Sequence, residues 1–210
     1  MEKKFILTDK FVINSFGIKL FQIKCTKSFK YAQKGDFGGY VEKEGNLDQE
    51  NDAWVFGNAR VFGNALVSGD AWVFGDALVS GNAWVSGDAR VFGNARVSGN
   101  ARVSGNARVS GDAWVSGNAR VSGDAWVSGD ADIENENDHC GFDGFGSCNR
   151  HTHAYMTKEK KVEIICGCFR GSIEEFEKKV EETHSGTVYE KQYKSIINVI
   201  KIKFGLTDFT

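Results

Sequence analysis

Residues 52–129 read DAWVFG NARVFG NALVSG DAWVFG DALVSG NAWVSG DARVFG NARVSG NARVSG NARVSG DAWVSG NARVSG DAWVSG. These are thirteen consecutive hexapeptides of the form Asn/Asp-Ala-x-Val-x-Gly, without an insertion. A fixed short period of this kind is typical of parallel β-helices. The sequence therefore predicts a mainly β protein built around a solenoid. It says much less about function, because solenoids serve many functions.

The positions within each repeat predict which side chains form the core. Side chains alternate between the two faces of a strand, so Ala53 and Val55 share one face, and Trp54 and Phe56 share the other. Alanine and valine recur in every repeat, which indicates the core, and the variable positions then point outward. Glycine with Asn or Asp forms each corner, because these residues adopt a left-handed backbone at least cost. Three such sides make a coil of about eighteen residues, and coils stack about 4.8 Å apart.

Side chains eighteen residues apart are therefore expected to form ladders on three outer faces. The first coils are apolar outside, and the middle coils carry arginines. One interpretation is that stacked Trp and Arg only support each other. The other is an interaction surface, since a contiguous apolar patch is rarely left uncovered; a homo-oligomer, or docking of the C-terminal region, would cover it. The predicted surface comprises Trp54, Phe56, Trp72, Phe74, Trp84, Arg90, Arg96, Arg102, Arg108, Trp114, Arg120 and Trp126.

Composition narrows the setting in which the protein works. The chain has 210 residues, a formal net charge of −2 and no proline. This charge gives no overall attraction to nucleic acid or to a membrane. The sequence has no apolar run long enough to span a bilayer and no signal peptide. We therefore expect a cytoplasmic protein without a membrane partner, whose five cysteines are reduced thiols.

The flanks of the array predict four segments. Residues 1–45 are expected to form an N-terminal β cap, with strands at 5–7, 11–13 and 18–24 and a turn-rich junction at 35–40. Degenerate repeats at 46–51 and 130–135 extend the β-helix to 46–135, about five coils. Residues 136–150 are expected to be a Gly-rich linker. Residues 151–210 are expected to form a small α+β domain of order ββαα, whose first helix begins after a capping box of Ser172 and Glu175.

The head and tail motifs resemble a family of hexapeptide-repeat proteins common in phages, prophages and gut bacteria. The head reads KGDFGGYVEKE at residues 34–44, then NL at 46–47. The tail reads CGCFRG at 166–171 and EEF at 174–176, followed by Val180, TH at 183–184 and Tyr193. The resemblance implies a repeat-built scaffold often encoded on mobile elements, and it supplies no catalytic residues. The left-handed sense of the β-helix is likewise implied by resemblance to hexapeptide solenoids.

The array also resembles the hexapeptide acyltransferases, which imply a catalytic histidine on or beside a coil. All four histidines lie beyond the array, at positions 139, 151, 153 and 184. Without a general base on the coils, acyl transfer lacks its proton acceptor. The same absence argues against a zinc site of the carbonic anhydrase kind on the coils. An acyltransferase is therefore the less favoured alternative.

Cysteine and histidine side chains near the tail allow a metal site or an enzyme there. His151 and His153 share one face of a predicted strand, and Cys166 and Cys168 share one face of the next. If these strands were adjacent, the four side chains could converge on zinc. The spacing matches no standard zinc pattern, and buried inert thiols with a surface histidine pair are the favoured interpretation. A Cys166–His184 nucleophile pair is a further alternative.

These observations favour a non-enzymatic protein-binding scaffold that needs no cofactor, with zinc as the alternative. The resemblance extends this to a phage-type accessory protein that inhibits a host defence or nucleic-acid-processing factor. Nucleotide or nucleic-acid binding along the Arg/Trp ladders is another alternative, because arginine can track phosphates and tryptophan can stack on bases. Against it, six aspartates in the repeats balance the six arginines.

Overall fold

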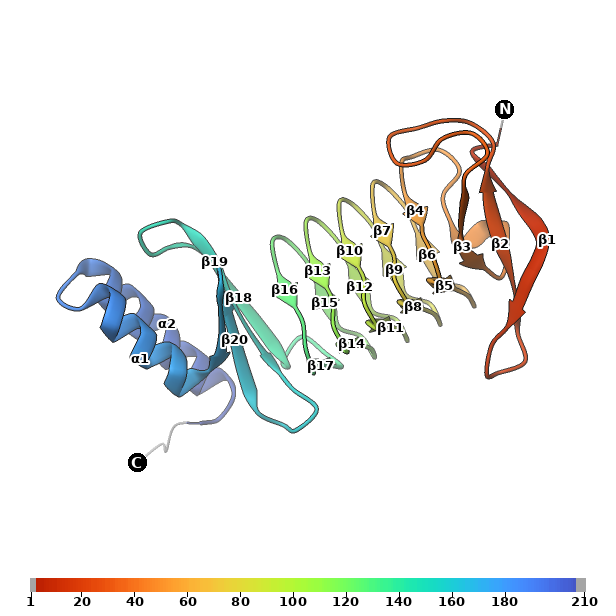
Figure 1. Cartoon of the computed structure of the whole chain (residues 1–210). Helices are drawn as coiled ribbons and strands as arrows, with labels where there is room; N and C mark the ends of the chain where they lie inside the picture. Colours follow the sequence, from red (N-terminus) through yellow and green to blue (C-terminus); the bar gives the residue numbers. More distant parts are fainter. Residues whose placement is uncertain (1–2, 207–210) are drawn as a thin grey trace.

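The computed structural model describes residues 3–206, and its centre is the parallel β-solenoid that the repeats predict (Figure 1). Each coil contributes one short strand to each of three faces. The first face holds β4 (Trp54–Val55), β7 (Trp72–Val73), β10 (Arg90–Val91), β13 (Arg108–Val109) and β16 (Trp126–Val127). The second holds β5 (Arg60–Val61), β8 (Leu78–Val79), β11 (Arg96–Val97), β14 (Trp114–Val115) and β17 (Asp132–Ile133). The third holds β6 (Leu66–Val67), β9 (Trp84–Val85), β12 (Arg102–Val103) and β15 (Arg120–Val121).

The predicted core and ladders are confirmed. Each repeat valine is fully buried, and each repeat alanine is at most 3% exposed. The register pairs residues eighteen apart, as in Arg90 with Trp72 and Arg102 with Trp84. Backbone amides bond to the next coil, for example the Trp72 N–H to the Ala89 carbonyl at 2.9 Å. Stacking therefore satisfies the backbone and buries a face that a single repeat could not bury.

The corners are tight because successive glycines lie against each other. Gly99 has φ +65, and a Cβ on it would lie 2.9 Å from the backbone nitrogen of Gly117. The corner glycine thus supplies both the left-handed backbone and the close approach between coils. Asparagine amides reinforce the corner before the third face, where Asn82 Nδ2 donates to Asn100 Oδ1 at 3.1 Å.

The N-terminal cap continues the sheet of the second face. It contains β1 (Phe5–Ile13), β2 (Lys19–Cys25), β3 (Phe37–Val41) and the short 3-10 helix η1 (Glu44–Asn46). The two expected strands at 5–7 and 11–13 are one strand with an irregularity in register. The expected turn-rich junction at 35–40 contains β3, which pairs with β2 antiparallel and with β5 in parallel. Gly38 and Gly39 serve close packing there, because a Cβ on either would lie under 3 Å from the first coil.

The cap also covers the start of the first face, which corrects the expectation for Trp54. This side chain points away from the coil interior, but it is only 1% exposed because Phe29 and Phe5 pack on it, with ring centroids 5.3 and 6.2 Å away. Tyr31 packs on Trp72 in the same way, at 4.4 Å. The chain's own N-terminal segment, rather than a second copy or the C-terminal region, therefore covers this part of the apolar face. Self-association through the less buried aromatic side chains stays a prediction.

The C-terminal domain is larger than expected. It contains β18 (His139–Phe145), β19 (Arg150–Met156), β20 (Val162–Cys166), β21 (Phe169–Ser172), α1 (Ile173–His184) and α2 (Val188–Lys203). The expected Gly-rich linker at 136–150 instead contains β18, which pairs antiparallel with β19. A further strand, β21, pairs with β20, so the order is ββββαα rather than ββαα. The capping box of Ser172 and Glu175 is confirmed. The extreme ends of the predicted cap and C-terminal domain, residues 1–2 and 207–210, lie outside the described residues.

The C-terminal sheet closes the last coil, as Figure 1 shows, with the two helices on its far side. Tyr155 and Ile165 join the core of the solenoid. The ring of His153 bonds to the Trp126 carbonyl through Nδ1 at 3.0 Å, and Thr157 forms a β-bridge with Ala131. Both open ends of the solenoid are thus covered, which protects unpaired strand edges from aggregation. Within residues 3–206, no helix has the length and apolar character needed to cross a membrane.

Candidate functional site

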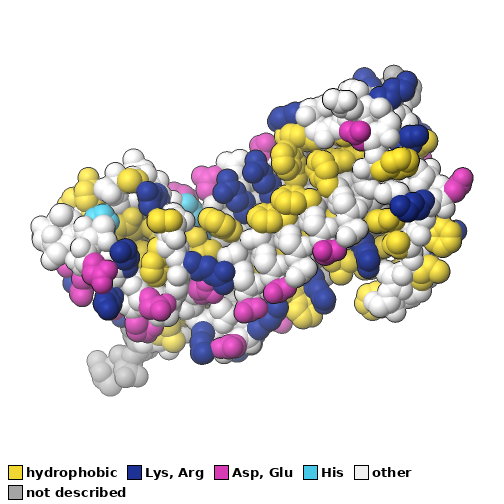
Figure 2. Space-filling model, in the orientation of Figure 1, with side chains coloured by type: hydrophobic (Ala, Val, Ile, Leu, Met, Phe, Trp, Pro, Cys, Tyr) yellow, Lys and Arg dark blue, Asp and Glu magenta, His cyan; other side chains and the backbone are white. Residues whose placement is uncertain are grey.

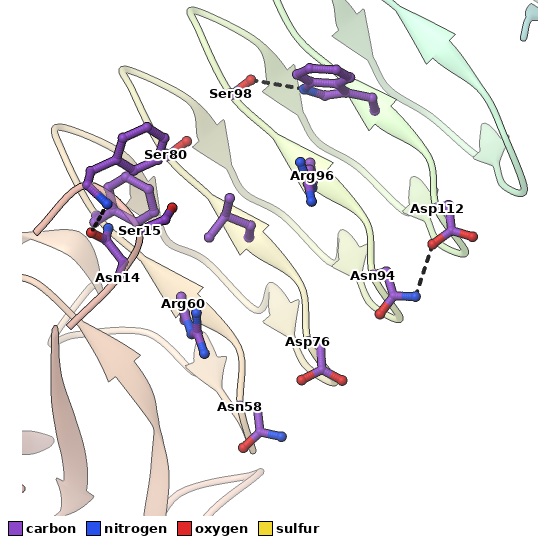
Figure 3. A pocket seen from close by; sticks show the side chains of 14 residues that line it. Asn14, Ser15, Asn58, Arg60, Asp76, Ser80, Asn94, Arg96, Ser98 and Asp112 are labelled. Carbon is purple, nitrogen blue, oxygen red and sulfur yellow. Dashed lines mark hydrogen bonds between the residues drawn. The ribbon is translucent and has the colours of Figure 1, made fainter. Parts of the chain in front are cut away.

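A trough lies along the second face of the solenoid, and Figure 3 shows the side chains that line it. The β1–β2 hairpin forms one end, and the β19–β20 hairpin forms the other; Figure 1 shows both extending along the side where β5, β8, β11 and β14 lie. The main cavity has a volume of about 690 Å³. An adjoining cavity of about 330 Å³ shares four of its residues and reaches Lys158. The main cavity is lined by Asn14, Ser15, Phe16, Asn58, Arg60, Phe62, Asp76, Leu78, Ser80, Asn94, Arg96, Ser98, Asp112 and Trp114.

The repeat period arranges these side chains in three rows. Asn58, Asp76, Asn94 and Asp112 follow one corner, and Phe62, Ser80 and Ser98 follow the other. The floor between them consists of Arg60, Leu78, Arg96 and Trp114. Arg60 and Arg96 are two rungs apart, which is about 10 Å at the usual strand spacing. The trough therefore alternates cationic and apolar contacts at a fixed interval.

The trough holds the two repeat arginines that have no partner within residues 3–206. Arg90, Arg102 and Arg108 each stack on a tryptophan of an adjacent rung, 4.9, 5.7 and 5.9 Å from the ring centre. Arg120 pairs with Glu136 at 3.5 Å. Arg60 and Arg96 have no hydrogen bond, ion pair or cation–π contact with another described side chain, and both are exposed. Figure 3 shows both guanidinium groups in the trough.

The N-terminal end of the trough is a rigid turn. The Asn14 side chain accepts hydrogen bonds from the backbone N–H groups of Phe16 and Ile18, both at 2.9 Å. Phe16 is thereby presented at the tip with 74% exposure, and its ring lies 6.3 Å from that of Phe62. The buried Nδ2 of Asn14 has no hydrogen-bond acceptor among the described residues. This end thus offers an apolar contact.

The C-terminal end of the trough is formed by the β19–β20 hairpin, whose lysines contact the last rungs. Lys158 donates from Nζ to the Asp112 carbonyl at 2.8 Å, and Lys160 lies 3.2 Å from the Asp132 carboxylate. These lysines hold the β19–β20 hairpin against the last rungs. The sequence does not predict either hairpin at the trough, because the position of each hairpin depends on pairings between residues far apart in the chain.

The structure distributes the twelve predicted surface residues over all three faces. Only Arg96 and Trp114 lie in the trough. The first face carries Trp54, Trp72, Arg90, Arg108 and Trp126, with Phe56 and Phe74 at its corner, and the third carries Trp84, Arg102 and Arg120. The stacked Arg–Trp pairs on these two faces agree with the interpretation that the ladders support each other. Figure 2 shows the hydrophobic side chains concentrated toward the N-terminal end.

The side chains of the alternative zinc site, His151, His153, Cys166 and Cys168, do not converge. The register of β19 and β20 places Cys166 opposite Thr152 and places His153 opposite Ile165. Since adjacent positions of a strand face opposite sides, the histidines and Cys166 lie on opposite faces of the sheet. Cys168 is exposed in the turn after β20. Across residues 3–206, no cluster of three or more His, Cys, Asp or Glu side chains could hold a metal ion.

The buried His153 and the half-buried His139 instead connect the C-terminal sheet to the last coil. His139 Nδ1 and His153 Nε2 lie 3.0 Å apart. When His153 donates its Nδ1–H to the Trp126 carbonyl, its Nε2 accepts a hydrogen bond from His139 Nδ1–H. Burial lowers the pKa of His153 to about 3 and also lowers the pKa of His139. Both rings are therefore neutral at pH 7, as this hydrogen-bond chain requires.

The alternative nucleophile pair of Cys166 and His184 does not form within the described part of the chain. Cys166 is buried and accepts a hydrogen bond from Thr152 Oγ1 at 3.3 Å. His184 stacks on Tyr193, with ring centroids 5.5 Å apart, and has no hydrogen bond to Cys166. Burial raises the pKa of the Tyr193 hydroxyl to about 12 and that of the Cys140 thiol to about 11, so both groups stay protonated.

The architecture defines a β-solenoid repeat protein. Comparison with known families agrees, because the YdcK beta solenoid repeat matches residues 53–69, 59–75, 89–103, 101–117 and 113–129. These matches lie within the hexapeptide array, so the similarity concerns the coils and not the two caps. No curated protein matches the chain. The resemblance of the head and tail motifs to phage and gut-bacterial proteins stays a prediction.

Proposed function

We propose that the protein is a non-enzymatic scaffold that binds a protein partner in the trough of the second face. The observation that carries this proposal is the unpaired state of Arg60 and Arg96. The other repeat arginines have a stacking or ionic partner among the described residues, whereas these two guanidinium groups are free on a rigid floor. The planar guanidinium fork matches the geometry of a carboxylate, so less entropy is lost for each hydrogen bond that forms.

The rows of the trough define the chemistry of the partner segment. Two carboxylates about 10 Å apart would reach Arg60 and Arg96. Between and beyond them, Leu78 and Trp114 offer apolar contact, and Phe16 offers it at one end. Asp76 and Asp112 on the corner oppose a uniformly acidic segment. The partner segment therefore combines separated acidic residues with apolar ones.

The biological setting of this scaffold is proposed from the head and tail motifs alone. Their resemblance to phage and prophage proteins favours an accessory protein that inhibits a host defence or nucleic-acid-processing factor. A rigid surface of this kind could inhibit a partner by covering its binding site, which requires no cofactor. The trough proposal does not depend on this setting.

Site-specific photo-crosslinking tests the proposal. A photoreactive phenylalanine analogue is placed at Leu78, in the trough, and in a matched variant at Leu66, the same repeat position on the third face. Tryptophan occupies this position in other repeats, so both variants are expected to fold. In bacterial cells, a discrete protein adduct is expected from position 78 and not from 66, and Arg96→Gln should abolish it. Equal adducts from both positions would refute the trough as the binding face.

A further inference from the structure

A second concave site lies at the junction between the first face of the solenoid and the C-terminal sheet. Two adjoining cavities of about 280 and 730 Å³ share Trp126, Arg150, Ile165 and Gly167. Arg108 and Trp126 form the solenoid wall, whereas Arg150 and Ile165 come from β19 and β20. We call this cavity pair the junction groove. It lies on a different face from the trough.

The aromatic element of the junction groove is Trp126. Its strand, β16, is the last of the first face, so no further rung covers the indole. The indole N–H is directed to Ser110 Oγ at 3.4 Å, which fixes the ring, and the side chain stays 36% exposed. Arg108 stacks on it from the preceding rung at 5.9 Å. A fixed, partly exposed indole with one uncovered side is suited to stack on a planar ring.

The cationic element is Arg150, on the opposite wall. Within residues 3–206 it has no hydrogen bond, ion pair or cation–π partner, in contrast to Arg170, which pairs with Glu163. Its guanidinium lies against Gly167, where a Cβ would be 2.6 Å from Nη1. The glycine, with φ +60, therefore leaves the space that the arginine occupies. Among the described residues Arg108 has no ion-pair partner either, so two guanidinium groups without an ion pair line the groove, together with the carboxylate of Asp124.

The third face provides an internal comparison. Arg102 stacks on Trp84 at 5.7 Å, as Arg108 does on Trp126, and Trp84 is likewise directed to a serine, Ser68, at 2.9 Å. Neither cavity of the junction groove is lined by Arg102 or Trp84. The junction groove thus differs from an ordinary rung by its second wall, which supplies Arg150 and the apolar Ile165.

We propose that the junction groove binds a nucleoside phosphate, whose base stacks on Trp126 and whose phosphate lies between Arg108 and Arg150. Bidentate guanidinium contacts suit phosphate, and base–indole stacking is tolerant of base identity. The ligand is a free mononucleotide or the terminal nucleotide of a single strand, which share this chemistry. The site is independent of the partner trough.

Isothermal titration of the full chain with AMP tests the proposal, with adenosine and inorganic phosphate as the two half-ligands. Saturable binding of AMP is expected, and each half-ligand should bind at least tenfold more weakly. Arg150→Gln and Trp126→Leu should each weaken AMP binding about tenfold or more. The matched substitutions Arg102→Gln and Trp84→Leu should leave it unchanged. Leucine already occupies this position in two repeats, and circular dichroism confirms folding of each variant.

A short single-stranded oligonucleotide distinguishes the two sources of the ligand. If it binds more tightly than AMP and Arg150→Gln weakens both, the groove accepts a strand terminus and the proposal stands. If AMP binding is absent at millimolar concentration, or if phosphate alone binds as tightly as AMP, the proposal is overturned. Equal weakening by Arg102→Gln would also overturn it, because the effect would then be one of general charge.

Discussion

Replacing Gly99 by alanine tests whether the close approach of successive coils requires glycine at the corner. The glycine has φ +65, and left-handed backbone costs an ordinary residue about 1–2 kcal/mol. The added Cβ would also lie 2.9 Å from Gly117 N and 3.0 Å from its carbonyl oxygen, both backbone atoms that cannot rotate away. Forcing atoms into a packed region adds about 1–3 kcal/mol. The expected loss for Gly99→Ala is therefore roughly 2–5 kcal/mol in the free energy of unfolding.

Gly123→Ala is the matched control. Gly123 has φ +64, but a Cβ there meets nothing within 4 Å, because its column of corner glycines ends at this residue. Only the backbone cost of about 1–2 kcal/mol applies. Thermal unfolding followed by circular dichroism should place the Tm of Gly99→Ala roughly 2–12 °C below that of Gly123→Ala. Equal Tm values would refute the reasoning that inter-coil contact, beyond backbone conformation, requires glycine.

Three further predictions concern the ends of the solenoid. Lowering the pH from 7 to 5 should reduce the free energy of unfolding by about 2 kcal/mol, because burial lowers the pKa of His153 from 6.5 to about 3. In this window His153 gains a proton in the unfolded chain but not in the folded chain. The loss of stability therefore starts as the pH falls through 6.5 and is complete near 3. Urea titrations at each pH measure the free energy of unfolding, and a pH-independent midpoint would contradict the prediction. Trp54→Ala should cost about 3–5 kcal/mol, since the ring is only 1% exposed, and a loss under 1 kcal/mol would show that the cap does not pack as described. Lys158→Ala removes a hydrogen bond to the Asp112 carbonyl and should lower the free energy of unfolding by about 1 kcal/mol or less. Hydrogen exchange should become faster in the β19–β20 hairpin alone, and a uniform increase over the whole chain would argue against a local role.

The solenoid could be predicted from the sequence because its contacts repeat. Each residue meets its equivalent eighteen positions away, so one hexapeptide predicts the core, the corner and the outer ladder together. The left-handed backbone of Gly99 and its relatives follows from the same pattern. The floor of the candidate site, which consists of Arg60, Leu78, Arg96 and Trp114, can be predicted in this way.

The caps could not be predicted to the same depth, because their pairings are not periodic. Trp54 reads as an outward side chain, and only the fold of residues 5–32 shows that Phe5 and Phe29 cover it. The spacing of the histidines and Cys166 is compatible with a shared face of the sheet. A shift of one residue in the strand register, however, moves a side chain to the opposite face. The ends of the trough depend on long-range pairings of this kind, and so does Arg150.

Affinity for the partner captured through Leu78 tests the central claim most directly. Two double variants are compared with the native chain by isothermal titration: Arg96→Gln/Trp114→Leu in the trough, and Arg102→Gln/Trp84→Leu on the third face. Buried Trp and Arg contacts in interfaces commonly contribute 2 kcal/mol or more, so the trough variant should bind about thirtyfold more weakly or worse. The third-face variant should bind like the native chain. If the third-face variant loses as much affinity, or the trough variant loses none, the trough does not bind the partner.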